Sequence, residues 1–563
     1  MRSLQATIRS RSFRKHGRGC LGAEWRVVAI LSALILVNLA AALDSTSISV
    51  ALPVITKDLG GDSISAFWCG TSFLVASTLI QPTLCVVSDL FGRKLAIVIS
   101  LVTFTIGSVQ CAAALSFTPM LCGRVFQGLG AGGFNVMTEV LLTDLLPLSQ
   151  RGTWFGVLGA SWAIGSACGP VVGGALAQLS SWRWIFWLNL PFIGLALLVM
   201  PFLLQLQKPP LTPTSLRSLD YLGACLFLTS LAALLIPLTW GGVVYPWTSW
   251  HTLVPLLLGA VGLLVFIMWE RRLPPSVHAF IPFTIFNNRS TILNYMGAFI
   301  LGMLLWTLLY YLPLYYEVAH GYSMVMSGVA LFPETFTTAP AGIATAFVIA
   351  RTQHYRWALW TGWTLSTVGL GLLRLLTVTT AVAHWIALNL TVGVGAGMLY
   401  PALALAIQSS APLSHMPIAV TMISTARNLG RTAGVALGGS IFQNRMRYHC
   451  RHSGVGALVA QAGVYAQDAA MLSEVVKGMP TDTKALEKEA LKVAYARALA
   501  DVWVFLCGVA GVGWLSSWFI KEFSMERELF TTQPLEPMGS TLPAAGDAAA
   551  ASREILLEER EAG

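Results

Sequence analysis

Charge is scarce in this sequence. Asp, Glu, Lys and Arg make up 11% of the 563 residues, whereas hydrophobic residues make up 55%. A soluble domain carries roughly 25% charged residues. Because a chain with so little charge cannot cover a surface that faces water, most of its surface must face lipid. The composition therefore excludes a string of soluble domains and predicts an all-α membrane protein.

The motifs of the common enzyme classes are also missing. The nine cysteines include no Cys-x-x-Cys pair, so the sequence predicts no disulfide framework and no metal site. No Walker loop, His-Glu-x-x-His motif or nucleophile elbow occurs, which predicts a protein that is not an enzyme and needs no cofactor. The formal net charge of +9 does not indicate a nucleic-acid partner, because the basic residues gather before the first apolar run and in short loops.

Long apolar runs recur along the chain from residue 27 onward. A helix needs about 20 apolar residues to cross the hydrocarbon core of a bilayer, and on this criterion we expect about fourteen spans. The predicted spans begin near Val27, Ile64, Leu95, Leu121, Trp154, Trp184, Tyr221, Leu253, Ile292, Met324, Ala358, Val382, Ile418 and Trp503.

The charges of the loops predict the orientation. Arg93, Lys94, Arg151 and further basic residues lie in alternate loops, whereas the opposite short loops hold little beyond Lys57 and Arg183. Loops rich in Lys and Arg stay in the cytosol, so both termini are expected there. The plasma membrane is the expected location, with the vacuolar membrane as the alternative.

The loop 88–94, between the second and third predicted spans, reads Ser-Asp-Leu-Phe-Gly-Arg-Lys. Here the chain resembles the major facilitator superfamily, whose loop signature has the form Gly-x-Leu-x-Asp-x-x-Gly-Arg-(Arg/Lys). Cys85 and Leu90 depart from that pattern.

The resemblance implies a latch at this loop. In the family, the loop arginine pairs with an acid at the cytosolic end of span four, and the chain has an aspartate there. A buried charge with a partner at the right depth favours this interpretation. Alternatively, the basic residues of the loop only fix the topology. The latch residues are Asp89, Gly92, Arg93 and Asp144.

Span four opens with Arg124-Val-Phe-Gln-Gly-Leu-Gly-Ala, which is similar to a second motif of the family. An arginine inside a membrane helix usually faces a cavity and has a partner; the alternative is an arginine that snorkels to the surface. Asp44 in span one lies at a similar depth, in a segment that resembles a motif of fourteen-span drug:proton antiporters. Asp44, Arg124 and Glu139 are therefore the proton-coupling candidates. For Asp44 the alternative is a structural hydrogen bond to the backbone.

Span five holds a run of small residues around a proline. Glycines four residues apart let another helix approach closely, and the proline introduces a kink. The Gly-Pro-x-x-Gly-Gly pattern resembles the antiporter motif of the superfamily, which implies an exporter. Its residues are Gly165, Gly169, Pro170, Gly173 and Gly174.

The substrate pocket is predicted less sharply. Trp306 and Tyr310 lie at helical spacing in span nine, where they would stack on a planar apolar substrate. Aromatic residues of this span are equally expected in an interfacial belt. Gln127 and Arg427 complete the candidate pocket.

The resemblance implies a major facilitator fold of two six-helix halves with two extra helices between them. The expected parts are a basic cytosolic N-terminus (1–26), the N-terminal half (27–205), two extra spans with a linker (206–290), the C-terminal half (291–520) with an external loop (445–499), and a disordered cytosolic tail (521–563).

The implied function is efflux of small apolar or amphipathic molecules in exchange for protons, as in fungal multidrug and toxin exporters. An importer of a siderophore or nutrient is the alternative. The expected partners are a small-molecule substrate, protons and the lipid bilayer, and the expected state is a monomer.

Overall fold

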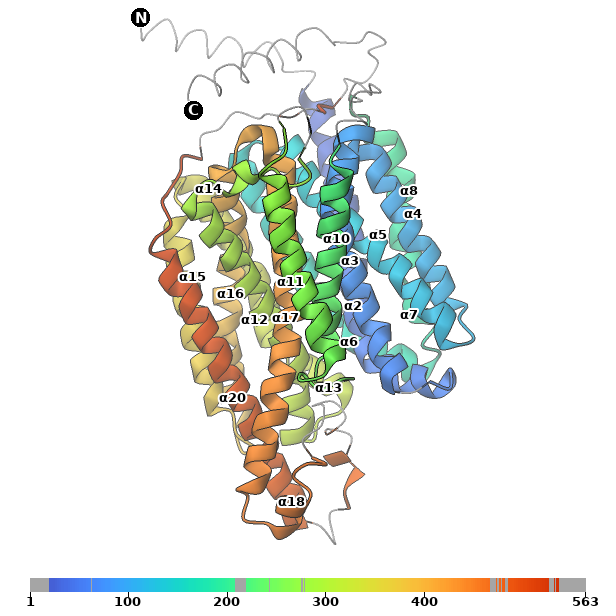
Figure 1. Cartoon of the computed structure of the whole chain (residues 1–563), viewed down its shortest axis with the longest axis vertical. Coiled ribbons are helices and arrows are strands. Elements are labelled where there is room, and N and C mark those ends of the chain that lie inside the picture. Colours follow the sequence, from blue (N-terminus) through green and yellow to red (C-terminus); the bar gives the residue numbers. More distant parts are fainter. Residues whose placement is uncertain are drawn as a thin grey trace, which may run out of the picture.

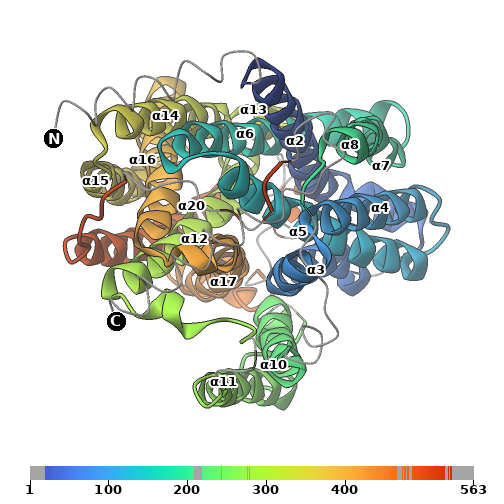
Figure 2. The ribbon, with the colours of Figure 1, turned by 90° about the horizontal axis from the view of Figure 1, so that it is seen from above.

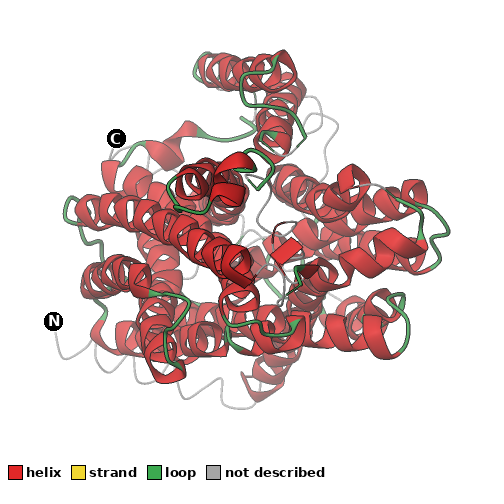
Figure 3. Cartoon of the chain, turned by 90° about the horizontal axis from the view of Figure 1, so that it is seen from below, coloured by secondary structure: helices red, strands yellow, loops and turns green. Residues whose placement is uncertain are grey.

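The computed structural model describes residues 20–535, except 62, 208–218, 243, 275–276, 278, 466–471, 473–474, 477, 481–484, 526–530 and 532. Most of the predicted basic N-terminus and residues 536–563 of the predicted tail therefore lie outside the described residues. Helices and their connecting loops make up the described chain, as Figure 3 shows. The prediction of an all-α protein is confirmed.

The N-terminal half packs as one bundle, on the blue and cyan side of Figure 1. Close helix contacts depend on glycine: at Gly130 of α5 an added Cβ would lie 2.5 Å from the backbone nitrogen of Phe104 on α4. The helices of this half are α2 (Cys20–Asp58), α3 (Ser63–Phe91), α4 (Arg93–Ala112), α5 (Phe117–Leu145), α6 (Leu148–Leu179), α7 (Trp184–Trp187) and α8 (Asn189–Leu203).

Two further helices, α10 (Tyr221–Trp240) and α11 (Trp250–Glu270), pair with each other at the edge of the molecule, beside α3 and α17 (Figure 2). Only 17% of the most apolar window of α11 is buried, so the rest of that helix is left to face lipid. Trp247, in the loop between them, donates to Ser440 Oγ at 2.7 Å, which fixes the pair to the C-terminal half.

The C-terminal half forms the second bundle, in yellow and orange in Figure 1. One cluster of buried hydrophobic side chains forms its core, with members from Ile300 to Met525 and one residue, Leu148, from α6. The elements from the connecting segment onward are η1 (Phe283–Phe286), α12 (Arg289–Ala319), α13 (Met324–Val329), α14 (Phe332–Thr352), α15 (Arg356–Leu372), η2 (Leu373–Leu375), α16 (Val382–Ser410), η3 (Leu413–His415), α17 (Met416–Arg451), α18 (Gly456–Ala460) and α20 (Ala485–Ser517).

Ten helices among the described residues are long and apolar enough to cross a membrane. The other four predicted spans coincide with α5, α14, α15 and α17. The helix α15 has 17 residues, while α5 and α17 carry the charged side chains described below. These charges lower the mean hydropathy of helices that are nevertheless packed inside the bundle. The total of about fourteen spans stays a prediction.

The segment predicted as an external loop is partly helical. The helix α17 runs on to Arg451, and α20 begins at Ala485, so residues 485–499 of the predicted loop and the last predicted span form one helix. Arg445 and His449 of α17 contact Asp501 of α20 at 3.3 and 2.9 Å. These contacts hold the two extensions together at the lower end of Figure 1.

Candidate transport site and its ion pairs

Asp44 lies at the centre of a buried polar cluster in the N-terminal half. Its Oδ2 accepts from Arg124 at 2.6 Å, and its Oδ1 accepts from Asn189 at 2.8 Å and from Gln127 at 3.3 Å. The Asp44 side chain is fully buried, and Arg124 is 1% exposed. The structure thus brings together the predicted partners Asp44 and Arg124, and the guanidinium does not snorkel to the surface.

Arg124 has partners on three sides. Its Nε donates to the Cys69 carbonyl at 3.0 Å, Nη1 also donates to Gln127 Oε1 at 2.8 Å, and the guanidinium lies 4.4 Å from the ring centroid of Phe73. Gln127, a predicted pocket residue, is completely buried within this cluster. The cluster therefore joins α2, α3, α5 and α8 inside one half, and Asn189 is the member that the sequence did not single out.

Glu139 lies elsewhere. It pairs with Arg427 of α17, so this ion pair joins the two halves. The Arg427 guanidinium also lies 4.3 Å from the ring centroid of Tyr400. The three proton-coupling candidates therefore do not form one cluster, because α5 presents Arg124 to α2 and Glu139 to α17. A role of Glu139 in coupling stays a prediction.

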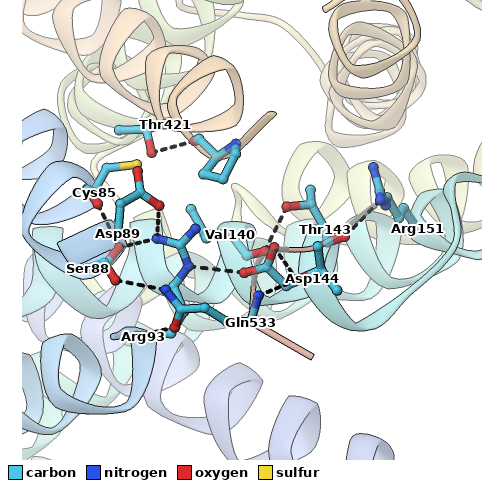
Figure 4. Close-up of polar contacts among 12 residues, drawn as sticks. Cys85, Ser88, Asp89, Arg93, Val140, Thr143, Asp144, Arg151, Thr421 and Gln533 are labelled. Carbon is cyan, nitrogen blue, oxygen red and sulfur yellow. Dashed lines mark hydrogen bonds and ion pairs between the residues drawn. The ribbon is translucent and has the colours of Figure 1, made fainter. Parts of the chain in front are cut away.

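The predicted latch residues meet at the end of the bundle that carries the α3–α4 turn, which we call the Arg93 end (Figure 4). Arg93 is fully buried; its Nε lies 3.0 Å from Asp144 Oδ2, and its Nη1 pairs with Asp89. Gly92 has φ of 96°, a backbone conformation that residues with a Cβ rarely adopt. Gly92 therefore allows the tight turn that points Arg93 at both carboxylates.

The chain after α20 adds contacts to this turn that the sequence did not predict. Gln533 Oε1 accepts from the Arg93 backbone nitrogen at 3.0 Å, and Gln533 Nε2 donates to the Ser88 carbonyl at 3.2 Å (Figure 4). Thr531 donates to Asp144 Oδ1 at 3.2 Å. Because α4 has no side-chain cap from Gly92, Gln533 supplies the acceptor that the first turn of this helix lacks.

Residues 521–525 bind the other half. The Lys521 nitrogen donates to Ser290 Oγ at 3.0 Å, the Tyr355 nitrogen donates to Glu522 at 3.1 Å, and the Phe523 nitrogen donates to Tyr355 Oη at 2.9 Å. Burial raises the pKa of the Tyr355 phenol, which remains protonated at neutral pH. The described part of the predicted disordered tail is thus ordered, and it connects the two halves at the Arg93 end.

The glycines predicted as an antiporter motif form the face of α6 that packs on α2. A Cβ at Gly165 would lie 2.8 Å from the Leu39 carbonyl, and one at Gly173 would lie 2.6 Å from the Ser47 carbonyl. Ser47 Oγ donates to the Gly169 carbonyl at 2.8 Å. The helix that carries Asp44 is therefore in backbone contact with α6. Pro170 and Gly174 of the same motif lie near α13, which belongs to the other half.

A cavity lies between the halves, bounded by α6, α12, α14, α16 and α17. Trp306 lines it, as predicted for a pocket residue, but Tyr310, Gln127 and Arg427 are not among its lining residues. Tyr310 instead packs edge-on against Tyr311. The polar and aromatic side chains of the wall include Trp162, Trp306, Glu334, Tyr400 and Arg431.

Arg431 and Trp162 were not predicted as pocket residues. Their signal in the sequence was weak: Arg431 follows Arg427 by one helical turn, and Trp162 precedes the glycine motif by one turn. The direction in which each side chain points from α17 decides whether Arg427 or Arg431 meets a carboxylate. A single sequence does not give that direction.

This arrangement defines a membrane transporter with a site between two halves. A family model described as Major Facilitator Superfamily matches residues 34–435. The chain belongs to the Major Facilitator Superfamily, and it is an integral, multi-pass transporter of small molecules and not an enzyme.

The relatives are fungal transporters. The chain is 46% identical over 508 residues to MFS transporter L2 of Phoma sp., covering 90% of this chain and 84% of that protein. It is 34% identical over 510 residues to the Acurin A biosynthesis cluster MFS-type transporter of Aspergillus aculeatus, covering 89% and 90%. It is 32% identical over 507 residues to Efflux pump FUS6 of Gibberella moniliformis, covering 89% of each. The predicted resemblance to fungal efflux pumps is confirmed.

Solved structures share the fold. The human organic anion transporter MFSD10 (TETRAN) matches with a TM-score of 0.57 at 16% identity, over 88% of this chain and 99% of that chain. A bacterial homologue of the human lysosomal transporter Spinster, in an inward-facing and unoccupied conformation, matches with a TM-score of 0.53 at 19% identity, over 88% and 98%. Likeness at this level of identity supports the major facilitator fold alone.

Proposed function

We propose that the protein exports small apolar or amphipathic organic molecules, such as a fungal secondary metabolite, in exchange for protons. The names of its relatives, among them an efflux pump and a transporter of a biosynthesis cluster, support export. In this proposal the Arg93 end faces the cytosol, the plasma membrane holds the protein, and one chain is the working unit. The cavity between the two halves of a single chain supports that last point.

The observation that carries the proposal is the contact between the Asp44 helix and the cavity wall. Asp44 is a buried carboxylate on α2, and α2 packs through its backbone on the glycine face of α6. The same helix, α6, lines the cavity through Gly159 and Trp162. A movement of α2 that follows protonation of Asp44 would therefore move a wall of the cavity.

Protonation of Asp44 would remove the negative charge that Arg124 pairs with. Breaking a buried ion pair by removing one charge costs roughly 3–5 kcal/mol, because the other charge stays buried and unpaired. The proton is therefore accepted only together with a rearrangement that gives Arg124 new partners or water. This requirement ties proton binding to a conformational change. It is the basis for exchange of protons against substrate as the halves alternate.

Transport into inside-out vesicles tests the proposal. Vesicles with an acidic interior would carry wild type, Asp44→Asn, or the control Asp58→Asn, and would be offered a panel of apolar drugs. Asp58 lies on the same helix, but its side chain is 48% exposed and pairs with Arg183. We expect uptake that depends on the gradient and is lost only in Asp44→Asn.

Other outcomes revise the proposal in distinct ways. Gradient-driven uptake that survives Asp44→Asn moves the coupling site to Glu139. Uptake that is the same with and without the proton gradient refutes proton coupling. Accumulation only in right-side-out vesicles favours an importer of a siderophore or nutrient.

A further inference from the structure

The arginines inside the bundle differ in their partners. Arg93, Arg124 and Arg427 each pair with a carboxylate. Arg151 donates to the carbonyls of Thr143 and Leu146 at 2.7 and 2.8 Å. The side chain of Arg431, at the middle of α17, has no ion pair or hydrogen bond with any of the residues that the structure describes.

Two tryptophans flank the Arg431 side chain. The central carbon of its guanidinium lies 4.9 Å from the ring centroid of Trp162 on α6 and 4.9 Å from that of Trp306 on α12. These helices belong to different halves, and all three side chains line the cavity. Cation–π contacts are worth roughly 0.5–2 kcal/mol each, but neither ring supplies the guanidinium with an oxygen acceptor or a negative charge. Its N–H groups lie in the plane of the group and remain free for an acceptor in the cavity.

In this cavity an arginine without a partner is more costly than a carboxylate without one, because only the carboxylate can lose its charge. Glu334, also in the cavity wall, is 3% exposed, and its side chain has no ion pair or hydrogen bond within the described chain. A buried carboxylate neutralises itself by taking up a proton, whereas a guanidinium stays charged at any physiological pH. The permanent charge in the cavity wall is therefore positive, because Arg431 carries it at any physiological pH.

We propose that the cavity binds an amphipathic organic anion through a carboxylate group that accepts in-plane hydrogen bonds from Arg431. The apolar body of the molecule lies against Leu305, Leu309 and the edges of the two tryptophans, which share the same wall. The fork of guanidinium donors matches the two oxygens of a carboxylate. This inference rests on the proposed function, in that the cavity is taken as the transport site.

A cationic substrate is the competing possibility, because aromatic rings and a carboxylate are the usual elements of a cation site. Here the cation–π positions of both Trp162 and Trp306 are already occupied by Arg431. A second cation between these rings would meet a fixed positive charge. The arrangement therefore favours the anion and disfavours the amine.

Binding to the purified full-length protein tests the inference without relying on transport. The probes are matched sets built on benzene, naphthalene and pyrene bodies, each as the carboxylate, the primary amide and the primary amine. We expect at least one carboxylate to bind at least tenfold more tightly than its amide and amine. Arg431→Met should remove this preference, and Arg431→Lys should keep part of it. Arg445→Met is the matched control, since Arg445 lies on the same helix with a side chain that is 50% exposed.

The possible results separate this inference from the proposed function. Equal binding of the three forms, preference for the amine, preference that survives Arg431→Met, or no measurable binding of any carboxylate to the wild type would each overturn it. A monodisperse sample with a melting transition like that of the wild type shows that a variant is folded. If Arg431→Met fails this check, Arg431→Lys decides: partial loss of the carboxylate preference supports the inference, and full retention overturns it. If Arg431-dependent carboxylate binding is found but vesicles show no gradient-driven transport, the proposed function fails and the binding site stands.

Discussion

The contact between Gln533 and the α3–α4 turn leads to a sharp prediction. Gln533 is 1% exposed and makes two hydrogen bonds there, to the Arg93 nitrogen and to the Ser88 carbonyl. The change Gln533→Ala removes both and leaves the first turn of α4 without a cap. We expect the segment that contains Gln533 to separate more often from the turn, because few other contacts in the described chain hold it. Thr531 donates to Asp144, the Gln207 nitrogen donates to the Pro534 carbonyl, and Leu535 forms a bridge with Leu206.

The magnitude follows from the number of bonds. A hydrogen bond contributes about 0.5–1.5 kcal/mol net, so two contribute about 1–3 kcal/mol. Since 1.4 kcal/mol corresponds to a factor of ten, the open fraction of this contact should rise by about five- to 150-fold. The double change Gln533→Ala/Thr531→Val removes a third bond and should approach the upper limit.

Hydrogen–deuterium exchange of the full chain in detergent or nanodiscs measures this opening. Amides of residues 88–96 and 531–535 should exchange faster in Gln533→Ala, with no change in α14. The control is Gln443→Ala, which removes the bond to the Gly242 carbonyl at a distant site. If the Arg93 amide exchanges at the wild-type rate in Gln533→Ala, the reasoning that Gln533 caps α4 is refuted.

Three further changes test the ion pairs and the glycines. Glu139→Gln should lower the free energy of unfolding by roughly 3–5 kcal/mol because Arg427 stays buried without its partner; a thermal melt equal to wild type would contradict this. Gly169→Val should abolish transport without loss of the protein from the membrane, because an added Cβ would lie 3.0 Å from the Leu43 carbonyl. Continued uptake into vesicles would show that α2 and α6 can separate enough to admit the side chain. Gly92→Ala should lower the free energy of unfolding by about 1–3 kcal/mol because of backbone strain. The control is Gly194→Ala, where the new Cβ meets no atom within 4 Å. Equal melting temperatures of the two variants would exclude strain at Gly92.

The sequence predicted local partners well and partners across the halves poorly. Asp44 with Arg124, and Arg93 with Asp144, were paired from their depth in the spans and from motif resemblance, and both pairs lie within the N-terminal half. Glu139 has its partner on α17, 288 residues away, and the sequence analysis gives no partner for it. Its true neighbour depends on how the two halves dock.

The described residues after α20 make contacts that the prediction of a disordered tail does not include. Its composition, rich in Glu, Ala and Pro, indicates disorder because it offers little apolar surface to bury. Gln533 and Thr531 are nevertheless held by hydrogen bonds to the Arg93 N–H at the start of α4, to the Ser88 carbonyl of α3 and to the Asp144 side chain of α5. Composition does not report such acceptor sites, because they exist only once α3, α4 and α5 have packed together.

Three buried carboxylate–arginine pairs differ in what a rocking motion does to them. Asp44–Arg124 and Arg93–Asp144 lie within the N-terminal half, so they can move with it as a rigid body. Glu139–Arg427 joins the halves, and so does the contact of Trp162 with Arg431. Separation of the halves must therefore break or lengthen these two contacts, which lie one helical turn apart on α17. An anion bound at Arg431 would supply the charge that the arginine needs while its contact with Trp162 is lost. The stability of the contact between the two halves and the occupancy of the cavity are then linked through the same turn of α17.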